Sequence, residues 1–187
     1  MASKKTCAIC MADGFETIEG LAPLDVMTRA GVEVDTIACT GDTGQVATSN
    51  GVLVSCTAQL GTRDLSAYDL VVIPGGMGGV DNLRQCPLVT DEIARRMNAG
   101  ELLGAICAGP MLLAEQHLLD GRTATCYPGC DVDFPAGVRP EKNGVYTDKN
   151  LITGSGPAFA VPFGLALTTA LLGPEAAQSV ASAMLVD

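Results

Sequence analysis

Short apolar runs alternate along the chain with longer segments in which apolar residues recur every three or four positions. Short apolar runs predict buried strands, and the spacing of three to four predicts helices. The predicted strands are 6–11, 32–38, 70–73 and 102–106, with a short pair near 52–55 and another pair in 144–153, and the predicted helices are 16–30, 88–98, 111–119, 159–172 and 174–184. This alternation predicts an α/β fold with a mainly parallel sheet covered by helices on both faces.

Turn-forming residues mark the ends of several of these elements. Gly100 follows the second predicted helix as a C-cap, and Asp120-Gly121 follows the third. The segment 127–143 is rich in Pro, Gly and charge and is predicted to be a loop, and the turn at 148–150 joins the last strand pair. We expect ligands at the carboxyl edge of the sheet, where the segments after residues 11, 73, 106 and 153 meet.

The composition predicts one globular domain over residues 1–187. The chain has 187 residues, 48% of them hydrophobic and 17% charged, with no internal repeat and no change of composition that would divide it. Aromatic residues make up only 4%. The core is therefore expected to depend on Val, Leu, Ala, Ile and Met.

The charge and the apolar segments exclude several classes of partner. A net charge of -10 would repel a phosphate backbone, so nucleic acid is not an expected partner. The longest apolar region, 159–173, is too short for a membrane span and is interrupted by Pro162. The apolar stretch at the N-terminus ends by Asp13, too soon for a secretory signal. We expect a soluble cytoplasmic protein with no membrane association.

The eight cysteines have irregular spacings, which favours reduced thiols over a disulfide framework. Cys7 and Cys10 lie three apart in a predicted strand and should point to opposite faces. Cys126 and Cys130 flank a Tyr-Pro-Gly turn. A disulfide or a metal there is the less favoured alternative to buried thiols.

Cys107 is the strongest candidate for chemistry. It ends the apolar run 102–106, and a helical pattern begins four residues later at Met111. A strand that turns sharply into a helix exposes the side chain at the turn, and the free N–H groups of the helix favour negative charge there. We therefore expect a partly ionised thiol, the alternative being a packed core cysteine.

The chain offers one histidine and two carboxylates as partners for this thiol. His117, the only histidine, falls in the predicted helix two to three turns beyond Cys107, where a surface position is the favoured interpretation. One histidine also excludes a two-histidine zinc site within the chain. Glu16 and Glu19 lie three apart at the start of a predicted helix and share a face. Either could reach the site, or both could simply favour the helix dipole.

Gly75 and Gly76 follow the strand 70–73 and expose backbone N–H groups. They fit an oxyanion site, and a plain tight turn fits them equally well. The run 74–79 has neither the spacing of a dinucleotide-binding fingerprint nor the ending of a phosphate-binding loop. We expect no cofactor and no metal.

Taken together, these residues resemble the ThiJ/PfpI superfamily, in particular the branch of the Parkinson-disease-linked protein deglycase. The resemblance spans nearly the whole chain. It rests on Glu19 with Pro23-Leu24-Asp25-Val26-Met27 and Arg29-Ala30-Gly31, on Val71-Val72-Ile73-Pro74-Gly75-Gly76, on Ala105-Ile106-Cys107-Ala108-Gly109-Pro110, and on Thr153-Gly154-Ser155-Gly156-Pro157.

The resemblance implies a flavodoxin-like three-layer sandwich, a homodimer, and a nucleophile elbow at Cys107. It implies Cys107 as the nucleophile and Glu19 as a protonated carboxyl group beside it. Gly75, Gly76 and the Ala108 amide would form the oxyanion site. The supporting residues that it implies are Glu16, Arg29, Tyr127, Gly156 and Pro157. Tyr127 stands where some relatives carry histidine, which favours a Cys–Glu site over one assisted by histidine.

Two functions are compatible with this resemblance. The first is an enzyme of glyoxalase or deglycase type, a lyase or hydrolase that acts through Cys107 on small reactive carbonyls or on glycated amines and thiols. The second is a redox sensor or redox-regulated chaperone that records oxidative stress by oxidation of Cys107, without turnover.

Overall fold

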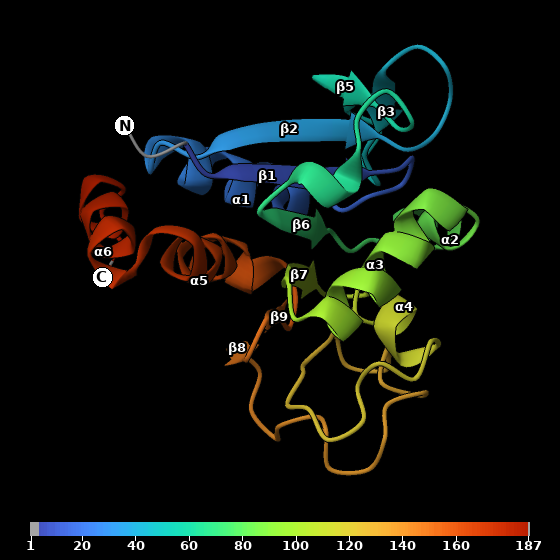
Figure 1. Ribbon diagram of the computed structural model, residues 1–187, viewed down its shortest axis with the longest axis vertical. Helices are drawn as coiled ribbons and strands as arrows, with labels where there is room; N and C mark the ends of the chain where they lie inside the picture. Colours follow the sequence, from blue (N-terminus) through green and yellow to red (C-terminus); the bar gives the residue numbers. More distant parts are fainter. Residues whose placement is uncertain (1–3, 187) are drawn as a thin grey trace.

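Seven strands form the central sheet in the order β5-β2-β1-β6-β7-β9-β8, and a separate hairpin joins β3 to β4. The computed structural model describes residues 4–186 (Figure 1). All neighbours in the sheet are parallel except the edge strand β8, which runs antiparallel to β9. The strands are β1 Thr6–Met11, β2 Glu33–Ala38, β3 Gln45–Ala47, β4 Leu53–Ser55, β5 Ala58–Gln59, β6 Leu70–Ile73, β7 Leu102–Ile106, β8 Val145–Asp148 and β9 Leu151–Gly154.

Helices cover both faces of this sheet and complete three layers. The elements are α1 Thr17–Arg29, α2 Met77–Arg84, α3 Pro87–Ala99, α4 Met111–Ala114, α5 Ala160–Leu172 and α6 Pro174–Ala183, with single 3-10 turns η1 Leu65–Ala67 and η2 Pro157–Phe159. Apolar side chains of α1 and α5 pack with one face of β1, and those of α2, α3 and α4 pack with the other. The flavodoxin-like three-layer sandwich is therefore confirmed.

The strand β1 shows how the sequence builds two cores at once. Cys7 and Ile9 pack into the core under α1 and α5, whereas Ala8 and Cys10 pack into the core under α2 and α3. Alternate side chains of a strand point to opposite faces, so a continuous apolar run is what a strand buried on both sides requires. The prediction that Cys7 and Cys10 face opposite ways is confirmed.

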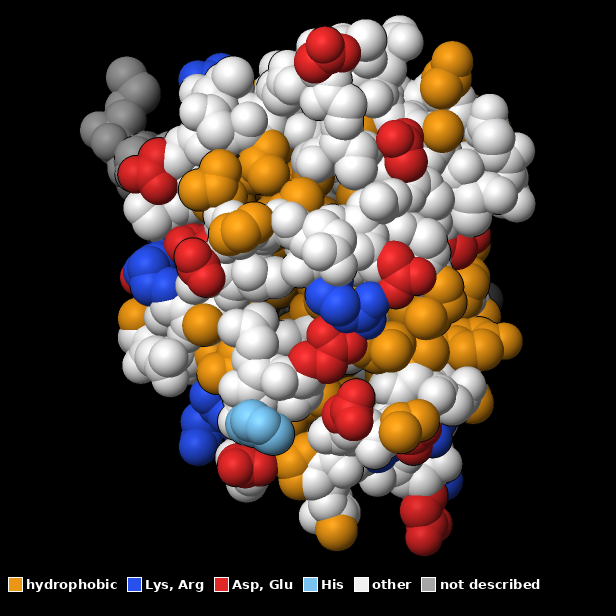
Figure 2. Space-filling view, turned by 90° about the vertical axis from the view of Figure 1, so that its right-hand side faces the viewer, with side chains coloured by type: hydrophobic (Ala, Val, Ile, Leu, Met, Phe, Trp, Pro, Cys, Tyr) orange, Lys and Arg blue, Asp and Glu red, His pale blue; other side chains and the backbone are white. Residues whose placement is uncertain are grey.

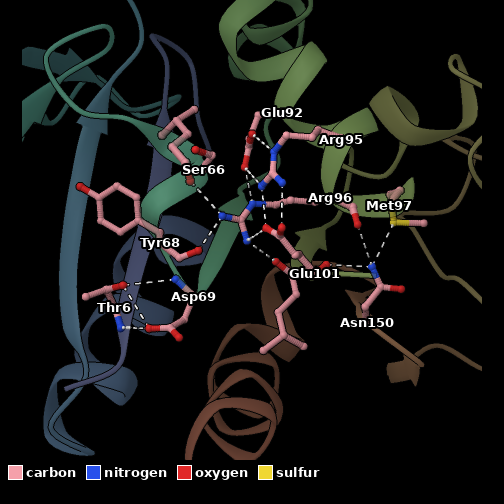
Figure 3. A network of polar contacts seen from close by, with 12 residues as sticks. Thr6, Ser66, Tyr68, Asp69, Glu92, Arg95, Arg96, Met97, Glu101 and Asn150 are labelled. Carbon is pink, nitrogen blue, oxygen red and sulfur yellow. Dashed lines mark hydrogen bonds and ion pairs between the residues drawn. The ribbon is translucent and has the colours of Figure 1, made fainter. Parts of the chain in front are cut away.

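A buried ion pair fastens the amino edge of the sheet (Figure 3). Arg96 of α3 is 0% exposed, and its Nε donates to Glu92 at 2.6 Å. Its remaining N–H groups donate to the carbonyl oxygens of Leu65, Tyr68 and Leu102. One guanidinium thus joins α3, η1 and the start of β7, and a buried charge is tolerated because every donor is satisfied.

One predicted helix is shorter in the structure, and one helix of the structure was not predicted. The predicted helix 111–119 is wrong beyond Ala114, because the chain continues through turns and His117 takes a left-handed φ of 57°. Helix α2 was absent from the prediction because Gly78 and Gly79 lie in its first turn, where glycine disfavours a helix. The helix 88–98 ending at Gly100 is confirmed, with Gly100 at a left-handed φ of 73°.

On the face in Figure 2, acidic side chains are spread between apolar ones, and Lys and Arg do not gather into a patch. Within residues 4–186, no helix combines the length and the apolar character that a membrane crossing requires.

Candidate functional site

Cys107 lies at the bend that leaves β7 and has a left-handed backbone, with a φ of 61°. Its N–H donates to the Gly154 carbonyl at 2.8 Å, and its own carbonyl accepts from the Tyr127 N–H at 3.0 Å. A residue with a side chain seldom adopts this conformation unless its surroundings impose it. The two backbone hydrogen bonds impose it here, and the predicted sharp turn at Cys107 is present. The side chain is partly exposed.

Glu19 brings a carboxyl group to this bend from the first turn of α1. The residue is 0% exposed. Its Oε2 accepts a hydrogen bond from the Gly75 N–H at 3.0 Å. Its Oε1 is buried and has no partner of hydrogen-bonding geometry within the part of the chain that the structure describes. One oxygen is thus held in place while the other remains available for a proton.

Gly75 lets the thiol and the carboxyl group approach each other. A Cβ at this position would lie 2.5 Å from the Cys107 Cβ and would also clash with the Glu19 Oε2. Both side chains therefore flank the same α-carbon, and any larger residue would separate them. Gly76 has a φ of 87°, where a Cβ would be 2.5 Å from the Glu16 nitrogen. The Pro-Gly-Gly segment is thus required by close packing as well as by its turn.

Both groups have raised pKa values, and burial is the largest cause for each. Burial raises the pKa of Glu19 to about 7, although the neighbouring Cys107 thiol and the Gly75 N–H lower it. Burial, followed by the charge of Glu19, raises the pKa of Cys107 to about 12, although the N–H groups of Gly76 and Ala108 oppose this. The expectation of a partly ionised thiol is therefore wrong for a pair with an ionised Glu19. The helix after Cys107 has only four residues, too few to offset a neighbouring carboxylate.

The backbone N–H groups near Cys107 are divided between the carboxyl group and the sulfur. Gly75 donates to Glu19. Gly76 and Ala108 are the amides that stabilise negative charge on Cys107. The oxyanion site implied by the resemblance included Gly75 together with these two, and in the structure the Gly75 N–H orients Glu19 instead.

The predicted supporting residues divide into those near the site and one far from it. Glu16 caps α1 by accepting from the Glu19 N–H at 3.0 Å, so it orients Glu19. The Tyr127 ring lies over Gly156, whose Cβ would be 3.1 Å from the ring, and Pro157 starts η2 directly after. Arg29 pairs with Asp25 at 2.9 Å and lies ten residues after Glu19, on the order of 15 Å along α1. The structure does not bring Arg29 to the site.

The single histidine is not part of the site. His117 is exposed and lies in the turns after α4. The prediction that His117 lies at the surface is confirmed. Within residues 4–186, no three His, Cys, Asp or Glu side chains are grouped so that they could hold a metal ion.

Sequence reasoning missed one backbone contact of the site and one cysteine that lies near it. The Gly154 carbonyl holds the Cys107 backbone, and the only signal for it was the predicted end of a strand beside β7. Cys130 is close enough to the site for the charge of Glu19 to contribute to its raised pKa, after burial and Asp131. Nothing in the spacing of Cys130 indicated this, because the loop 127–143 has no regular structure. The eight cysteines are free thiols, as predicted.

The model of the DJ-1/PfpI family matches residues 5–170, which include the whole Cys107 and Glu19 site. This chain belongs to the DJ-1/PfpI family. It is 33% identical over 183 residues to Protein dj-1beta of Drosophila melanogaster, covering 97% of each chain. It is 29% identical to the Glutathione-independent glyoxalase DJR-1.2 of Caenorhabditis elegans, covering 96% of each.

The solved structures of DJ-1/PfpI proteins share this fold. The oxidised form of Toxoplasma gondii DJ-1 aligns with a TM-score of 0.91 at 32% identity, covering 97% of this chain and 98% of that one. The sequence resemblance to the ThiJ/PfpI superfamily is thereby confirmed. The name of the Caenorhabditis elegans relative shows that the family includes a glyoxalase.

Proposed function

We propose that this DJ-1/PfpI protein is a glutathione-independent enzyme that detoxifies small reactive carbonyls at Cys107. The observation that carries the proposal is the buried Glu19 carboxyl group beside a cysteine held at a left-handed bend. A nucleophilic thiol with an adjacent acid is the minimum that addition to an aldehyde needs. The glyoxalase activity named for the Caenorhabditis elegans relative supports this substrate class.

The proposed reaction converts methylglyoxal and water to lactate. The Cys107 sulfur adds to the aldehyde carbon, and Glu19 donates a proton to the carbonyl oxygen, which gives a hemithioacetal. Glu19 then moves a proton from the former aldehyde carbon to the neighbouring carbon through an enediol, which gives a lactoyl thioester. Water releases lactate and restores the thiol, so no cofactor is required. The same addition to a glycated amine or thiol would be a deglycase reaction.

The Gly76 and Ala108 N–H groups would stabilise the negative charge that develops when the Cys107 sulfur adds to the aldehyde. Both stabilise negative charge on the Cys107 sulfur. An oxygen bonded to the carbon next to that sulfur would lie near the same donors, which is the arrangement that stabilises a tetrahedral adduct. Tyr127, half exposed beside Gly156, would form one wall for the substrate.

The test is lactate production from methylglyoxal in the absence of glutathione, with Cys107→Ser and Cys130→Ser as matched variants. Both cysteines are partly exposed free thiols. We expect Cys107→Ser to lose the activity by at least about a thousandfold, as removal of a nucleophile does, and Cys130→Ser to keep it. Activity retained in Cys107→Ser would refute the mechanism.

A second function is favoured by the partial exposure of Cys107. A hydroperoxide would convert the thiol to a sulfenic acid and then to a sulfinate, whose oxygens would accept from Gly76, Ala108 and a protonated Glu19. The protein would then be a redox sensor or a redox-regulated chaperone. Mass spectrometry after mild peroxide treatment should find the gain of two oxygens at Cys107. An even distribution of oxygen over the cysteines would argue against a sensor.

We also propose that the chain forms a homodimer, as the family resemblance implies. Three exposed apolar side chains support this. Ile18 of α1 is 47% exposed, and Val52 and Leu53 beside β4 are 51% and 67% exposed. The Asn50 side chain donates to Thr17 at 3.3 Å, so the three lie on neighbouring segments. Contiguous exposed apolar side chains of this kind mark interaction surfaces.

A further inference from the structure

Three cysteines that play no part in the proposed reaction meet under α2 and α3. Cys10 belongs to β1, Cys39 directly follows β2, and Cys86 lies at the junction between α2 and α3. The parallel register pairs Cys10 with Ile37. Cys39 follows Ile37 by two residues and therefore shares its face, and Cys10, Ile37 and Cys39 all lie in the core on that side. The sequence gives no hint of this cluster, because its members are far apart along the chain.

Cys86 covers Cys39 from the helix side. The Cys86 sulfur is 3.5 Å from the Cys39 carbonyl oxygen and 3.4 Å from the Asn82 carbonyl oxygen. The thiols also influence one another. Contact with Cys10 and burial raise the pKa of Cys39, and Cys86 contributes to the same shift. Cys39 therefore has Cys10 on one side and Cys86 on the other.

Access to the cluster decreases from Cys86 inward. Cys86 is partly exposed, Cys39 is 9% exposed and Cys10 is 0% exposed. Cys86 is the N-cap of α3 and has an extended backbone, with a φ of -105°. A side chain at a junction between helices can change its rotamer more easily than one on a central strand. Cys86 is thus the thiol that a reagent from solution meets first, with Cys39 directly beneath it.

The arrangement suits chemistry between two sulfurs better than metal binding. In the described chain, these thiols do not form a group of three ligands suited to a metal ion. Disulfide formation needs only two sulfurs that approach in pairs. Cys39 and Cys10 extend from neighbouring strands of the sheet, whose backbone is fixed on both sides. The pair of Cys39 and Cys86 has one partner outside the sheet and can adjust.

We propose that Cys39 and Cys86 form a reversible disulfide, distinct from the Cys107 site. In the first step the Cys86 thiolate attacks a low-molecular-weight disulfide such as oxidised glutathione, forms a mixed disulfide and releases one thiolate. In the second step the Cys39 thiolate attacks the Cys86 sulfur and releases the second thiolate. Two protein thiols are oxidised and one small disulfide is reduced, and the two protons lost by the protein thiols end on the two released thiolates, which leave as thiols.

The disulfide would connect the cluster to the region that holds Cys107. It would fasten the end of α2 to the carboxyl end of β2. Helix α2 begins directly after Gly76, whose N–H stabilises negative charge on Cys107. Oxidation of the cluster would therefore restrict the helix that carries one amide of the site.

The test equilibrates the full-length protein with oxidised glutathione, blocks the remaining thiols with N-ethylmaleimide and maps the peptides without reduction. Because burial raises the pKa of both Cys39 and Cys86, exchange is slow and the incubation is continued until the result is constant. We expect a peptide that joins Cys39 to Cys86 in the wild-type protein and in Cys107→Ala. The Cys107→Ala variant separates this result from the proposed enzyme, since the disulfide does not depend on Cys107.

Two serine variants complete the design. Cys86→Ser should lose the joined peptide, whereas Cys130→Ser, which changes another partly exposed thiol, should retain it. Oxidation should also raise the Tm of the wild-type protein by several degrees and leave that of Cys86→Ser unchanged, because the disulfide constrains the unfolded chain. Complete alkylation of both cysteines at equilibrium, or a disulfide between other cysteines only, would overturn the proposal.

Discussion

The cost of burying negative charge determines which protonation states Cys107 and Glu19 can adopt together. A thiol beside a carboxylate and a thiolate beside a carboxylic acid carry the same net charge. Transfer of one proton between them therefore buries no additional charge, whereas loss of both protons places two negative charges side by side. The raised pKa values of both groups express this cost. Transfer of the thiol proton to Glu19 is thus the way to form a thiolate at Cys107 without burying an additional charge.

This coupling predicts faster alkylation of Cys107 in Glu19→Gln. The charge of Glu19 raises the pKa of Cys107, and glutamine removes that charge while keeping the size of the side chain. At pH 8.5, a working value roughly equal to the pKa of a free thiol, iodoacetamide should modify Cys107 several times faster in the variant. Peptide mass spectrometry follows the rate, with Cys86 in the same protein as the control. An unchanged or slower rate would mean that Glu19 does not hold the thiol in its neutral form.

For the same variant, Glu19→Gln, we also predict a different dependence of the free energy of unfolding on pH. The pKa of Glu19 rises from 4.5 to about 7 on folding, so the unfolded chain loses this proton first as the pH increases. The wild-type protein should therefore lose free energy of unfolding between about pH 4.5 and 7, up to roughly 3 kcal/mol, and no more above that range. Glu19→Gln should lack this loss. Urea unfolding at a series of pH values measures it, and parallel profiles for the two proteins would contradict it.

Among the elements, α3 is joined to the amino edge of the sheet by the buried side chain of Arg96. Arg96→Ala removes the buried partner of Glu92, which keeps only its pair with Arg95, and removes the donors from Arg96 to three carbonyl oxygens. We expect a loss of about 3–5 kcal/mol in the free energy of unfolding. Arg95→Ala is the matched control, since Arg95 also binds Glu92 but is 39% exposed and should cost about 0–1 kcal/mol. Equal losses in urea unfolding would show that burial does not distinguish the two arginines.

The sequence predicts an element correctly where its pattern of apolar residues matches the side chains that the fold buries. The strands β1, β6 and β7 match the predicted ranges because each is a continuous apolar run between turn residues. The helix after Cys107 was predicted too long, because Leu118 and Leu119 continue the apolar spacing although the chain has already turned at His117. Leu119 is still buried, so the pattern identified its burial correctly and its secondary structure wrongly.

The sequence identified the residues of the candidate site, but it did not indicate their burial or their pKa values. Cys107 stood out because a strand ended there, and Glu19 because of its spacing and the family resemblance. An acidic residue in a first turn is usually exposed, so nothing local indicated that Glu19 is fully buried and holds the Gly75 N–H. That contact joins segments 56 residues apart, and it depends on the packing of α1 against the sheet.

Over the whole molecule, stability and chemistry lie at opposite edges of the sheet. The Arg96 network joins the starts of strands, where Asn150 also donates to the Glu101 carbonyl at 2.8 Å (Figure 3). Cys107 lies where the strands end. Changes at separated sites with no shared partners act additively on stability. The Arg96 network therefore takes no direct part in the Cys107 site.

A substitution that places a charge among the exposed apolar side chains tests the proposed homodimer. These side chains are Ile18, Val52 and Leu53. Leu53→Glu alters a side chain that is 67% exposed in the single chain, so folding should be unaffected while burial of the new charge in an interface would be costly. We expect the wild-type protein to sediment as a dimer and Leu53→Glu as a monomer at the same concentration. Val132→Glu, at an 85% exposed position outside this group, should remain dimeric. Because Ile18 precedes Glu19 in α1, a dimer formed through this surface would also cover one side of the Cys107 site. A wild-type monomer would refute the homodimer, and a Leu53→Glu dimer of unchanged stability would place the interface elsewhere.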